Sequence, residues 1–82
     1  MNNQQFTLKL RTLGFGDMGK DVKLIQRILR SRGIKDEFGK RCKVTGVLTH
    51  QTMYIINKVQ TMKHLKKRKY VDMETWLAIL EV

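Results

Sequence analysis

Two segments of the chain share one short pattern, in which two apolar residues three positions apart are followed directly by a glutamine. The segments are Val22-Lys23-Leu24-Ile25-Gln26 and Ile56-Asn57-Lys58-Val59-Gln60. Spacings of three and four residues place side chains on one face of an α-helix, so each segment predicts a helix whose buried face ends in an amide. For Gln26 we favour a buried-edge amide that hydrogen-bonds loop backbone over a catalytic role.

Three helices are predicted in all, over residues 20–32, 50–63 and 73–80. Thr49 and Asp72 precede the second and third helices, and each offers a side-chain oxygen to the first free N–H groups. The first helix carries acidic Asp21 in its first turn and arginines in its last, which suits the helix dipole.

Residues suited to a left-handed backbone follow the first two helices. Gly33 is expected just after the first helix, in the position that glycine prefers. His64 is expected at the same position after the second helix, where a histidine is tolerated at some cost. We interpret His64 as a helix end rather than a metal ligand.

A chain of 82 residues forms one small domain, because it buries only about 60–65% of its unfolded surface and cannot support two cores. The expected fold is all-α, a small three-helix bundle with long loops and a short extended N-terminal arm. Residues 1–12 would form the arm, in which Phe6, Leu8 and Leu10 alternate with polar residues. Residues 13–82 would form the domain.

The segment 13–19 holds three glycines and is predicted to be a loop. Because it precedes a helix, a phosphate-binding loop is the alternative to a plain helix entry. A P-loop requires Lys-Ser or Lys-Thr after its last glycine, whereas Lys20-Asp21 follow Gly19 here. We therefore favour the plain helix entry.

Several apolar residues outside the first two helices are expected to contact the core. They are Ile34, Phe38, Val44, Tyr70, Val71, Trp76, Ile79 and Leu80. Trp76 is also compatible with a carbohydrate-stacking platform, but its helical spacing with Ile79 and Leu80 favours the core.

The charge of the chain is strongly basic, with 17 Lys and Arg against 7 Asp and Glu and a formal net charge of +10. Such a field attracts anions in general, including nucleic acid, anionic lipid and acidic wall polymers. The single Cys42 excludes an internal disulfide. No apolar run reaches the length of a signal peptide or membrane span, so we expect synthesis in the cytoplasm.

Catalysis is not expected. The acids are scattered over caps and loops, and the two histidines, His50 and His64, lie about 20 Å apart at opposite ends of one predicted helix. That separation is too large for a shared metal ion. We expect no enzyme activity, no metal site and no cofactor.

Residues at fixed spacing recur over roughly residues 13–80. They are Gly16, Gly19, Asp21, Val22, Ile25, Gln26 and Leu29, then Gly46, Leu48, Thr52, Ile55, Ile56, Val59 and Gln60, then Leu65, and finally Thr75, Trp76 and Leu80. This arrangement resembles the small three-helix peptidoglycan-binding domains attached to many bacterial and phage cell-wall hydrolases. The family pattern contains Gly-x-Asp-Val-x-x-Leu-Gln, Asp-Gly-x-Phe-Gly-x-x-Thr, a later Phe-Gln, and Thr-Trp-x-x-Leu.

The chain also departs from that family. Thr49, His64 and Asp72 stand where the family has glycine, Thr45 replaces the acid before the turn glycine, and Val59 replaces phenylalanine. These changes surround the turn and the helix start where such domains are thought to contact the wall.

The resemblance implies a non-catalytic module that binds peptidoglycan, as a targeting subunit, an inhibitor, or a virion- or wall-associated component of phage or cellular origin. From their positions we expect stacking by Tyr54 and Tyr70, hydrogen bonds from His50, Gln51 and Asn57, and ion pairs from Arg41 and Lys43 to stem-peptide carboxylates.

The alternative is a small basic protein that uses the same fold to bind nucleic acid, a nucleotide-type anion or an acidic protein partner. Its anion patch would combine the cluster at Lys40, Arg41 and Lys43 with the run Lys66, Lys67, Arg68 and Lys69. The run is equally well interpreted as a solvated loop. Since no aromatic residues are interleaved with the basic ones, binding would depend on phosphate contacts.

Overall fold

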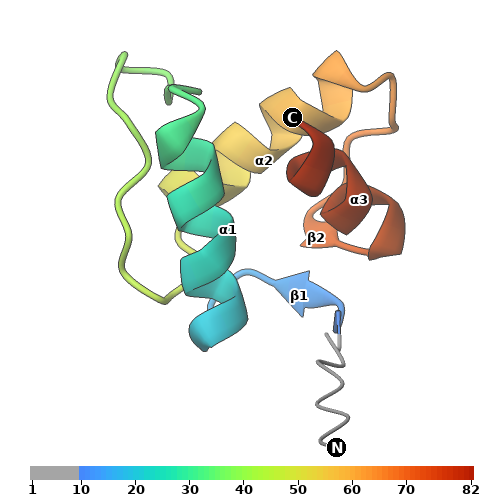
Figure 1. The fold of residues 1–82 in the computed structure, drawn as a ribbon, viewed down its shortest axis with the longest axis horizontal. Coiled ribbons are helices and arrows are strands. Elements are labelled where there is room, and N and C mark those ends of the chain that lie inside the picture. The colour runs from blue at the N-terminus through green and yellow to red at the C-terminus, as the bar shows by residue number, and fades with distance from the viewer. Residues whose placement is uncertain (1–9) are drawn as a thin grey trace, which may run out of the picture.

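The computed structural model describes residues 10–82, which form three helices and a small two-stranded antiparallel sheet (Figure 1). The elements in chain order are β1 (Leu13–Gly14), α1 (Lys20–Ser31), α2 (His50–Met62), β2 (Tyr70–Val71) and α3 (Met73–Glu81). The three predicted helices are confirmed, each to within one residue at either end. The predicted extended arm lies outside the described residues up to residue 9.

The sheet joins the start of the described chain to the segment before α3. Leu13 pairs with Val71 and Gly14 with Tyr70. The prediction that residues 13–19 form only a loop is therefore wrong at its first two residues. Two residues are too few to show period-two alternation, and only the distant partner strand makes them a strand.

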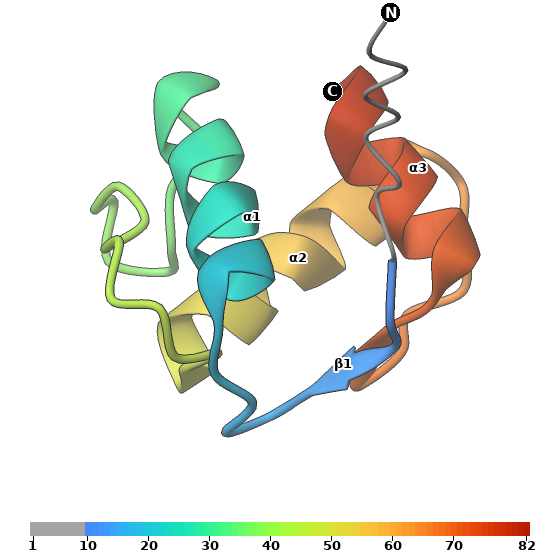
Figure 2. The same ribbon diagram turned by 60° about the horizontal axis from the view of Figure 1, so that its bottom comes forward.

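The helices are arranged so that α1 and α3 lie at opposite ends of α2 (Figures 1 and 2). Within residues 10–82, the core between them contains 14 buried apolar residues. Its largest member is Trp76, which has no exposed surface and donates its indole N–H to the carbonyl of Arg11 over 2.8 Å. The expectation that Trp76 belongs to the core is confirmed. Leu10 packs against the same core.

The helix ends follow the chemistry of their sequence. Thr49 Oγ1 accepts the N–H of Thr52, and Asp72 Oδ1 accepts the N–H of Thr75. Both predicted N-caps are thus confirmed. His64, which follows the last turn of α2, has a φ of 60°, so the predicted left-handed residue is also confirmed.

Gln26 fastens α1 to the turn that precedes α2. Its Oε1 accepts the backbone N–H groups of Thr45 and Gly46, each over 2.8 Å. Its Nε2 donates to the carbonyl of Val47 over 2.8 Å and to Thr52 Oγ1 over 3.0 Å. The expected structural role of this buried amide is confirmed.

Gln60 fastens α2 to the segment that precedes α3. Its Oε1 accepts the backbone N–H of Arg68 and one N–H of the Asn57 side chain. Its Nε2 donates to Thr75 Oγ1 over 3.0 Å and to the carbonyl of Tyr70 over 3.4 Å. The repeated sequence pattern therefore corresponds to a repeated interaction, in which a buried glutamine bonds the backbone of the segment that precedes the next helix.

Three of the residues expected to contact the core are exposed instead. Phe38 is 78% exposed, Tyr70 is 44% exposed and Leu80 is 40% exposed. In α3 the buried face is centred on Trp76 and Ile79, which turns Leu80 toward solvent. Val71, next to Tyr70 in β2, is fully buried, and neighbouring residues of a strand point to opposite faces.

Candidate binding groove

An open groove of about 750 Å³ runs along the exposed side of α2. Its lining residues are Phe15, Asp36, Glu37, Phe38, His50, Gln51, Met53, Tyr54, Asn57 and Lys69. They come from the loop after β1, the turn in the middle of the α1–α2 loop, the first two turns of α2 and the residue before β2. Segments far apart in the sequence therefore meet at this groove.

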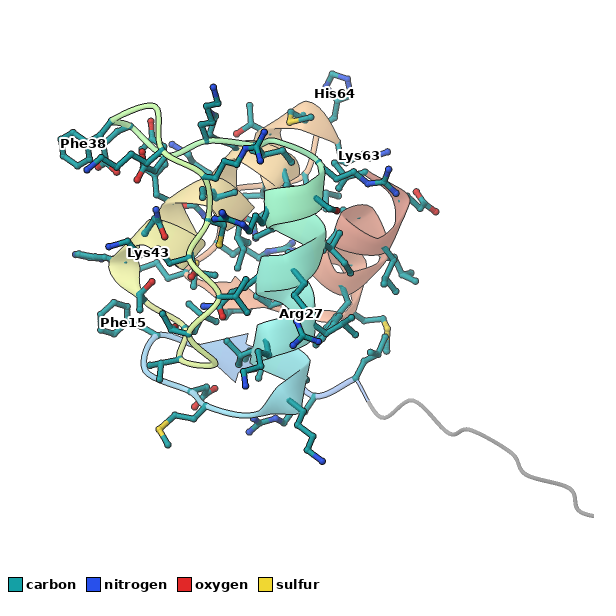
Figure 3. All side chains as sticks on the ribbon, turned by 60° about the vertical axis from the view of Figure 1, so that its left-hand side comes forward. Phe15, Arg27, Phe38, Lys43, Lys63 and His64 are labelled. Atoms are coloured by element: carbon teal, nitrogen blue, oxygen red, sulfur yellow. The ribbon has the colours of Figure 1, made fainter. Side chains whose placement is uncertain are left out.

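Aromatic side chains give the groove its character. Phe15 is 64% exposed and Tyr54 is 39% exposed, and Phe38 is the most exposed of the three. The rings of Phe15 and His50 meet edge to face, with centroids 5.2 Å apart and an interplanar angle of 70°. Figure 3 shows Phe15 and Phe38 on the same side of the molecule, both projecting away from the ribbon.

Phe15 is held outward by the turn on which it sits. Asp17 Oδ2 accepts the N–H of Gly14 over 2.7 Å, which closes the turn around Phe15. The N–H of Gly16 donates to the carbonyl of Leu48, and the N–H of Leu48 donates to the carbonyl of Asp17. These bonds fix the loop to the segment leading into α2, so the exposed ring has a firm backbone beneath it.

Phe38 is held outward by the carboxylate of Asp36. Asp36 Oδ1 accepts the N–H groups of Phe38 and Lys40, each over 2.8 Å, and its Oδ2 accepts the side chain of Gln51 over 2.9 Å. The hydrogen bond from Gln51 lowers the pKa of Asp36, and the backbone donors lower it further. This turn presents Phe38 to solvent, which explains why its predicted core contact is wrong.

Gln51 and Asn57, two of the residues predicted to contact the ligand, use their side-chain amides in hydrogen bonds within the protein. The side chain of Gln51 accepts the N–H of Lys43 and donates to the carbonyl of Arg41 as well as to Asp36. Asn57 uses its amide N–H groups on Gln60 and on the carbonyl of Arg68. Both line the groove, but their hydrogen bonds hold its wall together. His50 and Tyr54 are the predicted residues that the groove exposes.

A second hollow of about 290 Å³ continues the groove toward the end of α2 and shares Tyr54 and Asn57 with it. The added lining residues are Lys58, Thr61, Met62 and Lys67. The surface along α2 thus changes from aromatic at its start to cationic near its end. An elongated ligand could occupy both parts.

The remaining predicted contacts lie outside both hollows. Arg41 and Lys43 are exposed on the loop before α2, and Tyr70 is exposed on β2. Arg41 and Lys43 are near the groove through their backbone bonds to Gln51. The structure therefore gathers His50, Gln51, Tyr54 and Asn57, and leaves the other three at or beyond the margin.

The two basic clusters of the predicted anion patch flank opposite ends of α2 (Figures 1 and 2). The cluster at Lys40, Arg41 and Lys43 precedes the helix, and the run from Lys66 to Lys69 follows it. Within the run, Arg68 is paired with Asp72 over 2.7 Å and approaches Glu74 at 3.5 Å. Lys69 lines the first hollow and Lys67 the second, while Lys66 is exposed outside both.

Metal binding, thiol reactivity and membrane spanning are further properties to consider in residues 10–82. No group of three His, Cys, Asp or Glu side chains in this part of the chain could hold a metal ion. Cys42 is buried, and burial raises the pKa of its thiol. None of the helices between residues 10 and 82 has the length and apolar character needed to cross a membrane.

Comparison with known proteins adds no relative. No protein-family model, no curated protein sequence and no solved structure matches this chain.

Sequence reasoning missed Phe15 and Phe38 as site residues. Phe15 lies between Gly14 and Gly16, and Phe38 precedes Gly39. An aromatic residue next to glycine in a turn is a signal for an exposed ring, because turn residues lie on the surface. That signal alone does not indicate that the two turns face the same helix.

Proposed function

We propose that this domain is a non-catalytic binding module of the peptidoglycan-binding kind, and that the groove along α2 is its contact with the bacterial wall. The observation that carries the proposal is the set of exposed aromatic rings, Phe15, Phe38 and Tyr54, on turns and a helix held by internal hydrogen bonds. Exposed rings on a firm scaffold are typical of a binding surface, since they contribute large contact area at little entropic cost.

The resemblance to three-helix wall-binding domains supports the choice of ligand. In that pattern the glutamine of the first helix, the turn glycine and the helix that follows recur together, and here Gln26 bonds directly to the turn at Gly46. The groove begins beside this turn, at His50. Sugar rings and peptide side chains offer apolar faces to the aromatic rings, and His50 and Tyr54 offer polar atoms to amides and hydroxyls.

Two lysines of the groove suit the carboxylates of wall peptides. Lys69 lines the first hollow and Lys67 the second, and neither is paired with a carboxylate within 4 Å in residues 10–82. A wall strand lying along α2 would place neutral sugar or peptide against the rings and a free carboxylate near these lysines. This arrangement gives binding that depends on both apolar contact and charge.

Co-sedimentation with purified sacculi tests the proposal. The wild-type domain should be retained at moderate salt, and Phe38→Ala should reduce the bound fraction severalfold. Leu77→Ala is the matched control, because Leu77 is an exposed apolar residue of α3 outside both hollows. Wild-type protein that stays in solution even at low salt, or equal loss in both variants, would contradict the proposal.

A further inference from the structure

A second surface, separate from the groove, is formed by four basic residues of α1. Lys20, Lys23, Arg27 and Arg30 are all exposed. With 3.6 residues per turn they fall within an arc of about 80° on the helix, and they span about 15 Å along its axis. None of them lines either hollow of the groove.

The adjoining loop contacts this face. Arg30 donates its Nη1 to the carbonyl of Cys42 over 3.2 Å, and the Lys23 side chain lies over Gly46, with its Cε 3.7 Å from the position of a Cβ on that glycine. Lys43, which is exposed, lies between these two points of the loop. Figure 3 shows Arg27 on α1, away from the labelled Phe15, Phe38 and Lys43. We call Lys20, Lys23, Arg27 and Arg30 the basic face.

The charges of the basic face are not neutralised internally. In residues 10–82, carboxylates lie within 4 Å of only two basic side chains, Arg11 and Arg68. Asp21 is the one acidic residue of α1, and it forms an ion pair with Arg11 at 2.7 Å. A row of uncompensated cations on a rigid helix creates a local positive potential that attracts a polyanion.

The surroundings of this face indicate which polyanion fits. A membrane-surface helix exposes a broad apolar face beside its basic one, but Val22, Ile25 and Leu29 of α1 are fully buried, and Leu24, 38% exposed, is the one large apolar residue that α1 exposes. Single-stranded nucleic acid binds through stacking on aromatic rings, and α1 carries none. A nucleic-acid duplex needs only a row of cations along its backbone, since one strand places a phosphate about every 3.4 Å of axis.

We infer that the basic face binds the backbone of double-stranded nucleic acid, without reading its sequence. The row from Lys20 to Arg30 is long enough to follow about four phosphates of one strand. Arg27 can donate in a bidentate manner to a phosphate, and the lysines act as point charges. The exposed face carries no asparagine or glutamine aimed at a base edge, so the contacts are with phosphates.

Fluorescence anisotropy of a labelled 20-base-pair DNA duplex tests this inference. Lys23→Gln/Arg27→Gln should weaken binding about tenfold at 50 mM salt and lower the slope of log K against log salt by about 1.8, because each lost phosphate contact removes about 0.9. Lys66→Gln/Lys67→Gln removes the same charge at the far end of α2 and should change affinity less than about threefold.

Additional variants and assays distinguish binding at the basic face from binding at the proposed wall groove. Lys23→Arg/Arg27→Lys keeps the charges and should retain duplex binding, while circular dichroism checks that each variant is folded. Lys23→Gln/Arg27→Gln should sediment with sacculi as the wild type does. Absence of duplex binding, equal weakening by the two charge-removing pairs, or equal competition by flexible polyphosphate at the same phosphate concentration would overturn the inference.

Discussion

A buried glutamine joins neighbouring segments at each end of α2, and we call these two contacts the first junction, at Gln26, and the second junction, at Gln60. The interactions that stabilise the two junctions differ. At the first, Gln26 bonds three backbone groups of the turn before α2, at Thr45, Gly46 and Val47. At the second, Gln60 bonds two backbone groups of the segment before α3. The second lone-pair position of Gln60 Oε1 is filled by the side chain of Asn57.

An ion pair compensates for the weaker second junction. Arg68, whose N–H is held by Gln60, forms a salt bridge with Asp72, the N-cap of α3. Gln26 bonds only amides, carbonyls and hydroxyls, and no ion pair among residues 10–82 involves the turn at residues 45–47. The difference teaches that the junction at Gln26 is held by neutral hydrogen bonds, whereas the junction at Gln60 also depends on an ion pair.

Replacing each glutamine by leucine should give the largest and most unequal effects. Each buried group left without a partner costs about 1–3 kcal/mol, so Gln26→Leu should lower the free energy of unfolding by about 2–4 kcal/mol and Gln60→Leu by about 1–3 kcal/mol. Urea unfolding measures both. Arg27→Leu, at the exposed neighbour of Gln26, should stay within about 0.5 kcal/mol of wild type. Equal losses in the two glutamine variants would break the comparison.

The backbone at the two junctions predicts changes of opposite sign. Gly46 has a φ of 83° and a Cβ added there meets only ordinary contacts, so Gly46→Ala should lose about 1–2 kcal/mol from conformational strain. His64 has a φ of 60° at the other end of α2, so His64→Gly should gain up to about 1 kcal/mol after the entropy cost of glycine in the unfolded chain. Thermal unfolding measures both variants, and a destabilised His64→Gly would count against this account.

Acid should weaken the second junction through Asp72. Burial raises the pKa of Asp72, but the hydrogen bonds from Thr75 and the charge of Arg68 outweigh it, so the pKa lies below its usual value. A lowered pKa means that the carboxylate stabilises the fold above about pH 4, and that this stabilisation is lost as pH falls through the folded-state pKa.

Asp72→Asn isolates that charge, because asparagine caps a helix about as well as aspartate. At pH 7 the variant should be less stable than wild type by up to about 1 kcal/mol, as expected for a partly exposed ion pair. The difference should shrink as pH falls through the folded-state pKa of Asp72. A difference that stays constant from pH 7 to pH 2 would show that the charge of Asp72 does not secure the junction.

The sequence predicts the helices of this chain well because their signals are local. Thr49 and Asp72 act as caps within one turn, and the spacing of Val22, Ile25 and Gln26 is read directly along one helix. The same spacing predicted that Gln26 bonds loop backbone. Local chemistry therefore accounts for the helix ends and for the repeated glutamine.

The errors lie where contacts are distant in sequence. Phe38 is apolar and so was expected in the core, but the local bonds to Asp36 close a turn that exposes it, and the bond from Gln51, fifteen positions away, joins that turn to α2. Leu13 belongs to a strand only because Val71 pairs with it. The candidate groove has the same origin, since its rings come from separate loops, and so only part of it was predictable.

The central claim is that the aromatic groove along α2 is the wall-binding face. Nuclear magnetic resonance titration of the labelled domain with soluble muropeptide fragments tests it residue by residue. The claim predicts that the amide signals of Phe15, Phe38, His50 and Tyr54 shift together and saturate, while those of Lys20 and Arg27 on the basic face stay in place. Shifts confined to α1, or no shifts at millimolar fragment, would contradict it.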